Sequence, residues 1–257
     1  MAARHRARRG GIALLAGLEH TAMNQRQPGN SSPQHLSVGE LYRKALDLLH
    51  AGRLDEAHKV CMSILAVRPK QPDVHSLLAA IAYQNQDSVA AVAHFQKAMK
   101  LDPDNLEIRL NLAKTHRDFE QWADAAKVFE TIVKRIPNDS AVLYDLGKAY
   151  DHLRHHENAV QHYRRALAGT AAPDVIETDL ATALLKMGAL ADAEAHYAAV
   201  LDRTPNFTPA LINLAVLRDI QAGWTMRWRY SRPHWPMIPT VWTHTTIMPL
   251  PSSRASA

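Results

Sequence analysis

The chain has 257 residues, of which 47% are hydrophobic and only 10 are glycine, a composition typical of a folded helical protein with enough chain for a continuous core. Its one cysteine excludes an internal disulfide, and no apolar run is long enough to predict a membrane span. The formal net charge is +5, but residues 38–207 carry 20 Lys and Arg against 23 Asp and Glu. The positive excess therefore lies at the two ends, and no nucleic-acid-binding stripe is predicted on the body.

The first 37 residues keep no repeat pattern. Four arginines between positions 4 and 9 precede a mostly apolar stretch at 11–18. This order faintly resembles a secretory signal, but the apolar run is short and no clear cleavage site follows it. We interpret residues 1–37 as a disordered leader, with translation starting at Met23, and expect a cytoplasmic protein. Export is the alternative if the arginine-rich segment is a true signal.

From residue 38 to 207 the sequence repeats every 34 residues. One column is alanine, at Ala57, Ala91, Ala125, Ala159 and Ala193. Three columns in the same phase hold leucine (Leu78, Leu112, Leu146, Leu180, Leu214), small residues (Ala45, Ala79, Ala113, Gly147, Ala181, Ala215) and aromatic residues (Phe95, Phe129, Tyr163, Tyr197). A proline closes most units, at Pro69, Pro103, Pro137 and Pro205. This period predicts stacked helix-turn-helix units.

Each column has a packing reason. Small residues belong where the two helices of a hairpin cross most closely, because a larger side chain would hold the backbones apart. Aromatic residues fill the wider gaps towards the next unit. Proline lacks a backbone N–H and disfavours helix in the residue before it, so it ends the second helix of each unit.

These columns resemble those of tetratricopeptide-repeat proteins, and the unit at 106–139 carries the motif well through Leu112, Ala113, Trp122, Ala125, Phe129 and Pro137. The resemblance covers five full units, at 38–71, 72–105, 106–139, 140–173 and 174–207, and the first helix of a sixth at 208–222. It implies an all-α fold, a right-handed α-solenoid of antiparallel helix-turn-helix units.

Some positions depart from the pattern. In the first unit, Lys44 stands in the leucine column and Cys61 in the aromatic column, which suits a terminal, partly capping repeat. We expect Cys61 to be a small buried hydrophobe rather than a reactive thiol. In the fourth unit, Ala171 replaces the proline, and Pro173 follows two residues late.

Residues 223–257 keep no helical period, although they hold four of the five tryptophans, and the sixth alanine position holds Arg227. When the bases are read in the frame that starts at the third base of each preceding codon, a four-fold arginine codon at 227 yields alanine. In that frame the position of Thr225 becomes an obligatory aspartate. We interpret residues 223–257 as a frame-shifted, disordered tail, with the repeat continuing in the gene. A functional tryptophan-rich peptide is the alternative.

The resemblance implies a concave face, lined by the first helix of each unit, that holds an extended peptide or a partner helix. We expect Asn111 and Asn213 to grip a peptide backbone, while Lys114, Arg117 and Lys148 attract acidic groups in a field that nearby aspartates partly cancel. An ordinary solvated helix face is the alternative. The full candidate set is Tyr83, Asn111, Lys114, Arg117, Tyr144, Asp145, Lys148, Asp151, Asp179 and Asn213.

We predict a noncatalytic protein-protein interaction scaffold with no cofactor, metal, nucleic-acid or membrane partner. No phosphate loop, nucleophile elbow or cysteine-pair metal motif is present, and only fragments of the clamp that binds chaperone carboxyl termini occur. We expect His116 and His156 to be ordinary hydrogen-bonded residues, and the group His152, His155, His156 and His162 to be surface rather than a metal site. The alternative is the truncated repeat region of a multidomain transferase, a sulfotransferase or glycosyltransferase, whose catalytic domain is missing.

Overall fold

The structure, a computed structural model, describes residues 36–230, with side chains up to residue 223. This part of the chain contains eleven α-helices and no strand, which confirms the predicted all-α fold. The predictions of a disordered leader and of a disordered, frame-shifted tail fall mainly on residues 1–35 and 231–257, which lie outside the described residues.

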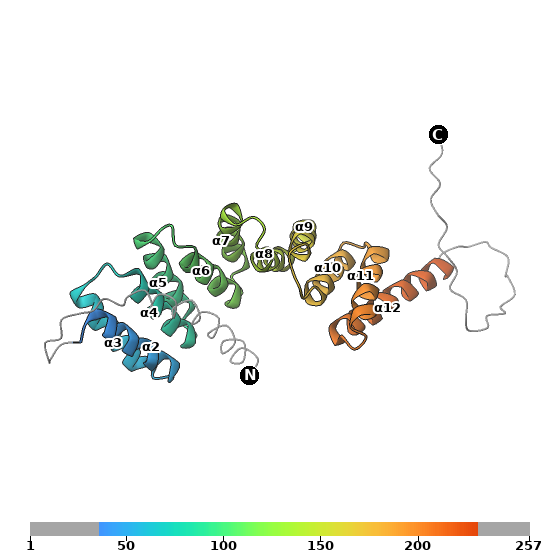
Figure 1. Cartoon of the computed structure of the whole chain (residues 1–257). Helices are drawn as coiled ribbons and strands as arrows, with labels where there is room; N and C mark the ends of the chain where they lie inside the picture. Colours follow the sequence, from blue (N-terminus) through green and yellow to red (C-terminus); the bar gives the residue numbers. More distant parts are fainter. Residues whose placement is uncertain (1–35, 231–257) are drawn as a thin grey trace. The chain divides into compact units, whose positions relative to one another are not determined.

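The helices form antiparallel pairs, and successive pairs follow one another along the chain (Figure 1). The first helices of the pairs are α2 (Val38–His50), α4 (Pro72–Gln84), α6 (Leu106–Asp118), α8 (Ser140–His152), α10 (Asp174–Lys186) and α12 (Thr208–Tyr230). The second helices are α3 (Leu54–Val67), α5 (Ser88–Leu101), α7 (Trp122–Arg135), α9 (His156–Leu167) and α11 (Leu190–Arg203). Within each set, every helix begins 34 residues after the one before it.

The chain divides into two compact units, one ending at Leu217 and the other beginning at Arg218. The first holds the five hairpins and the start of α12. The described part of the second is the remainder of α12, which runs to Tyr230 and so extends past residue 222, where the sequence predicts the helix to end.

The core is built from the repeat columns. All five alanines of the 34-residue series are completely buried, and the aromatic column from Phe95 to Tyr197 is at most 1% exposed. At Gly147 a Cβ atom would lie 2.7 Å from the ring of Tyr163, so the small column marks the close crossing that its residues predict. The two exceptions in the first unit also behave as expected, since Lys44 is exposed and Cys61 is fully buried.

The prolines end the second helices by the expected mechanism. Arg68, Asp102, Ile136 and Thr204 each precede a proline and adopt φ between −129° and −135° with ψ between 75° and 86°. Such an extended backbone is what the proline ring imposes on the residue before it. The fourth unit lacks this proline. There the residue after α9, Ala168, stays in the right-handed helical region.

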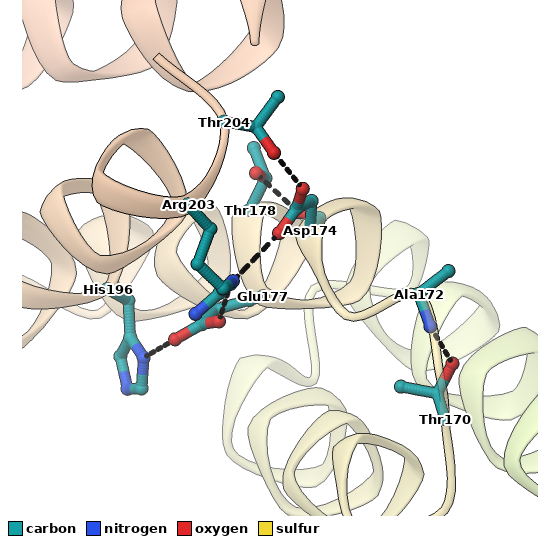
Figure 2. Close-up of polar contacts among 8 residues, drawn as sticks. All are labelled: Thr170, Ala172, Asp174, Glu177, Thr178, His196, Arg203 and Thr204. Atoms are coloured by element: carbon teal, nitrogen blue, oxygen red, sulfur yellow. Dashed lines mark hydrogen bonds and ion pairs between the residues drawn. The ribbon is translucent and has the colours of Figure 1, made fainter.

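A polar cluster accompanies the altered connection between α9 and α10, as Figure 2 shows. Pro173 is the N-cap of α10, and the carboxylate of Asp174 accepts from the Thr204 hydroxyl at 2.6 Å. The Arg203 guanidinium bonds to both Asp174 and Glu177. These contacts join the start of α10 to the end of α11, and α10 still begins on the 34-residue period.

The tight turn inside each hairpin places one residue in the left-handed region. These residues are Gly52, Gln86, Glu120, Arg154 and Gly188, spaced by 34, with φ between 60° and 81°. Glycine adopts this conformation without strain, whereas other residues pay a steric penalty. Three of the five turns are therefore strained in the folded state.

Candidate functional site

The residues predicted to line the binding face all lie on first helices, but several are buried. Tyr83 is 2% exposed, Asn111 4% and Asp145 9%. Buried polar side chains need partners, and most of these find them on the neighbouring first helix. We call the resulting row of contacts, which links α4, α6, α8, α10 and α12, the first-helix ladder.

Arg117 is central to the ladder. Its guanidinium bonds to Asp118 beside it and to Asp145 on α8, where Nη1 lies 2.6 Å from Oδ2. Burial of the guanidinium disfavours its charge, but the two carboxylates outweigh that effect and raise the pKa of Arg117. The pair holds α6 and α8 together through a short, charge-assisted hydrogen bond.

Three further ladder contacts join residues that are 35 positions apart. The hydroxyl of Tyr83 donates to Asp118 at 2.9 Å, and the hydroxyl of Tyr144 donates to Asp179 at 2.7 Å. Lys186 donates to Asp151 at 2.6 Å. A spacing of one repeat plus one residue therefore places a donor on one first helix against an acceptor on the next.

The ladder is partly dry. Burial, followed by the neighbouring aspartate charge, raises the pKa of Tyr83 and of Tyr144. Burial also raises the pKa of Asp179, although the hydrogen bond from Tyr144 opposes the change. At the far end, Asn213 on α12 donates to Thr182 on α10 at 3.0 Å.

Eight of the ten candidate residues thus interact with another side chain of the array. The partners Asp118, Thr182 and Lys186 were missed from the sequence, because a spacing of 35 falls outside the 34-residue columns. The remaining two candidates are Asn111, which is buried, and Lys114, whose ammonium has no ion pair among the described residues.

Two half-buried lysines occupy one position in successive units. Lys114 on α6 and Lys148 on α8 are 34 residues apart. Lys148 lies over the ring of Tyr144, with its Nζ atom 5.4 Å from the ring centroid, and has no carboxylate partner within the described part of the chain. These two cations are the charges that the ladder leaves available.

The histidines take up structural contacts. As expected, His116 and His156 are hydrogen-bonded, to Gln121 and Asp151 respectively, each through Nδ1. His152 stacks on Trp122 with ring centroids 3.7 Å apart, and His162 stacks on Tyr150.

Two searches of the described residues found no site of the kind sought. No group of three or more His, Cys, Asp or Glu residues is arranged to hold a metal ion between residues 36 and 223. In the same part of the chain, no helix combines the length and the apolar character needed to cross a membrane.

Several other proteins have solved structures with the same fold. MamA of Desulfovibrio magneticus RS-1 is 19% identical with a TM-score of 0.60, and the match covers 64% of this chain and 93% of that one. A tetratricopeptide-repeat protein of Parabacteroides merdae gives 18% and 0.64, covering 75% and 76%. YrrB, described as having an unusual peptide-binding site, gives 14% and 0.62, covering 69% and 91%. At these identities the similarity concerns the fold.

Two curated relatives are longer proteins. The DnaJ homolog subfamily C member 7 homolog of Schizosaccharomyces pombe is 26% identical over 168 residues, which cover 56% of this chain and 35% of the relative. The beta-barrel assembly-enhancing protease of Yersinia pestis is 30% identical over 165 residues, which cover 63% and 33%. The matched region of this chain therefore spans about a third of the length of each relative.

Family models described as tetratricopeptide repeat match residues 42–105, 82–149 and 140–168. These matches fall on the hairpins whose columns, turns and proline stops are described above. Together with the solenoid structures that share the fold, they show that the chain belongs to the tetratricopeptide-repeat family.

Proposed function

We propose that this chain is a noncatalytic protein-interaction scaffold that binds an extended peptide or a partner helix on the face lined by its first helices. Its family serves protein-protein interaction, and all ten candidate side chains lie on first helices. The ladder makes this face rigid, because its side chains already hold one another in place. A rigid face loses little conformational entropy when a partner binds.

The observation that carries the proposal is the pair Lys114 and Lys148. They occupy the same position in successive units and have no carboxylate partner in the described structure, while the nearby aspartates are largely engaged by Arg117, Tyr144 and Lys186. The free charge on this part of the face is therefore positive. An extended peptide with acidic groups would complement it.

A peptide-display selection on the full chain tests this function. We expect selected peptides to be enriched in Asp and Glu, and the double change Lys114→Ala with Lys148→Ala to weaken their binding at least about tenfold, as loss of two charge pairs should. Lys134→Ala, on the exposed surface of α7, is the matched control and should bind normally. If no peptide is selected, or if the double variant binds like the unaltered chain, the proposal is wrong.

A second candidate, the repeat region of a longer transferase, draws support from α12. Five members of the small-residue column are buried under the second helix of their own unit, but the sixth, Ala215, is exposed. Leu211, Ile212 and Val216 on the same helix are 45%, 57% and 47% exposed. A second helix of a sixth unit, as the alternative reading frame would encode, would cover such residues.

Sequencing the source DNA and transcript around Gln221 tests the continuation. A restored frame that encodes further repeats and then a strand followed by a phosphosulfate-binding loop would support the transferase. A stop codon soon after the repeats would support a pure scaffold. An intact frame without repeat-matching codons would reject the continuation altogether.

A further inference from the structure

Two histidines of the second hairpin face each other outside the first-helix ladder. His75 lies on α4 and His94 on α5, and their Nδ1 atoms are 3.4 Å apart. The ring centroids are separated by 5.7 Å, with 29° between the ring planes. Both side chains are half-buried, so the pair has access to solvent while its positions are set by packing.

The other hairpins show that these two positions face each other as a property of the repeat. In the fifth unit the same positions hold Glu177 and His196, whose Oε1 and Nδ1 atoms are 3.0 Å apart. In the fourth unit they hold Leu143 and His162. Among the five described hairpins, the second alone places two imidazoles there. The juxtaposition of His75 and His94 therefore rests on helix packing that recurs elsewhere in the molecule.

The distance between the two nitrogens suits a shared ligand. A metal ion with bonds of about 2.0–2.1 Å to each of two nitrogens 3.4 Å apart would subtend an angle of about 110° between them, which is close to tetrahedral. Imidazole nitrogens are preferred ligands of Zn²⁺, Cu²⁺ and Ni²⁺, and the tetrahedral angle favours Zn²⁺.

The protonation states also fit. Burial, and then the charge of His75, lowers the pKa of His94 to about 4, and burial lowers the pKa of His75. Both rings are thus neutral at neutral pH, as metal ligation requires. The ring of His75 also hydrogen-bonds the backbone of Pro69. Proline has only a carbonyl to offer, so the ring donates, which leaves Nδ1 as the unprotonated nitrogen and supplies the outer-shell contact common in metal sites.

We propose that His75 and His94 form a two-histidine site for a divalent transition-metal ion, Zn²⁺ by its geometry, that bridges α4 and α5. Water completes the coordination, since no third ligand converges on the pair among the described residues. The bound ion cross-links the two helices of the second hairpin. The site shares no residue with the proposed peptide-binding face and does not depend on it.

Calorimetric titration of the purified full chain with Zn²⁺ alone tests the site. The chain has 15 histidines, so the comparison between variants carries the result. We expect His75→Gln and His94→Gln each to remove one binding event or weaken it at least about tenfold, because even outer-shell losses cost 10-fold to 100-fold in metal affinity. The matched control is His162→Gln, which changes the position equivalent to His94 where no histidine lies opposite.

Imidazole nitrogen NMR spectra of the full chain provide a second measurement that does not rely on variants. Addition of Zn²⁺ should shift the Nδ1 signals of His75 and His94 together and leave those of His162 in place. The proposal is overturned if His75→Gln and His94→Gln bind Zn²⁺ like the unaltered chain. It is also overturned if His162→Gln loses the same binding event, or if the two Nδ1 signals do not move.

Discussion

Arg117 and Asp145 lie on successive first helices, and their side chains meet with Nη1 and Oδ2 only 2.6 Å apart. The side chains are 22% and 12% exposed, so the pair is shielded from water on most sides. Removal of the arginine would leave a mostly buried carboxylate without its strongest partner, and such a loss costs far more than an exposed ion pair is worth.

The first prediction follows from this pair. Arg117→Met should lower the free energy of unfolding by about 2–3 kcal/mol, somewhat less than for a fully buried pair. Urea denaturation followed by circular dichroism measures it. Arg53→Met breaks a pair whose side chains are 59% and 51% exposed and should change stability by less than about 1 kcal/mol. Equal losses for the two variants would contradict a stabilising role for the ladder.

The hairpin turns give a second prediction, in both directions. Gly188 has φ of +81°, and a Cβ atom added there would meet no other atom within 4 Å, so Gly188→Ala should cost about 1 kcal/mol through backbone strain alone. Arg154, at the equivalent turn, has φ of 63°. Arg154→Gly should therefore raise stability by about 0.5–1 kcal/mol. Thermal unfolding checks both changes, and midpoints that move the opposite way would show that the turns are unstrained.

Asp179 predicts a dependence on pH. Because its folded-state pKa is raised by burial, the folded state holds its proton more tightly than the unfolded state, whose pKa is near 3.9. Its contribution to stability is therefore most favourable at acid pH and is lost as the pH rises through the folded-state pKa.

Asp179→Asn removes this ionisation and should reduce the loss of stability between pH 4 and neutral pH. Urea midpoints measured across that range give the result. Asp192→Asn, at an exposed position on α11, should leave the profile of the unaltered chain unchanged. A profile for Asp179→Asn that matches that of the unaltered chain would rule out Asp179 as the source.

Cys61 makes the fourth prediction simple to read, because it is the only cysteine. It is fully buried, and burial raises the pKa of its thiol to about 12. A thiol reagent at pH 8 should label it only as fast as the protein unfolds. In the variant Cys61→Ala with Met62→Cys, the thiol sits at a neighbouring exposed position and should react at once. Rapid labelling of native Cys61 would contradict its burial.

The repeat columns were sufficient to predict the all-α solenoid, because a 34-residue period admits few other packings. Ala57, Phe95 and Leu112 lie in the core for the reasons that their columns indicate. The proline stops were equally local, since a proline acts on the residue directly before it. The left-handed turn position was hidden from the columns because three different residue types, at Gln86, Glu120 and Arg154, occupy it beside two glycines.

The sequence by itself determined the helices, their pairing and the core of this protein, because these depend on periodic hydrophobic contacts within and between neighbouring units. Only the tertiary structure decided what the polar residues of the first helices do. Tyr144 and Asp179 are 35 residues apart, and whether such side chains meet depends on how one unit is rotated and offset against the next. That rotation turns most of the predicted binding residues into contacts between units and leaves Lys114 and Lys148 as the available charges.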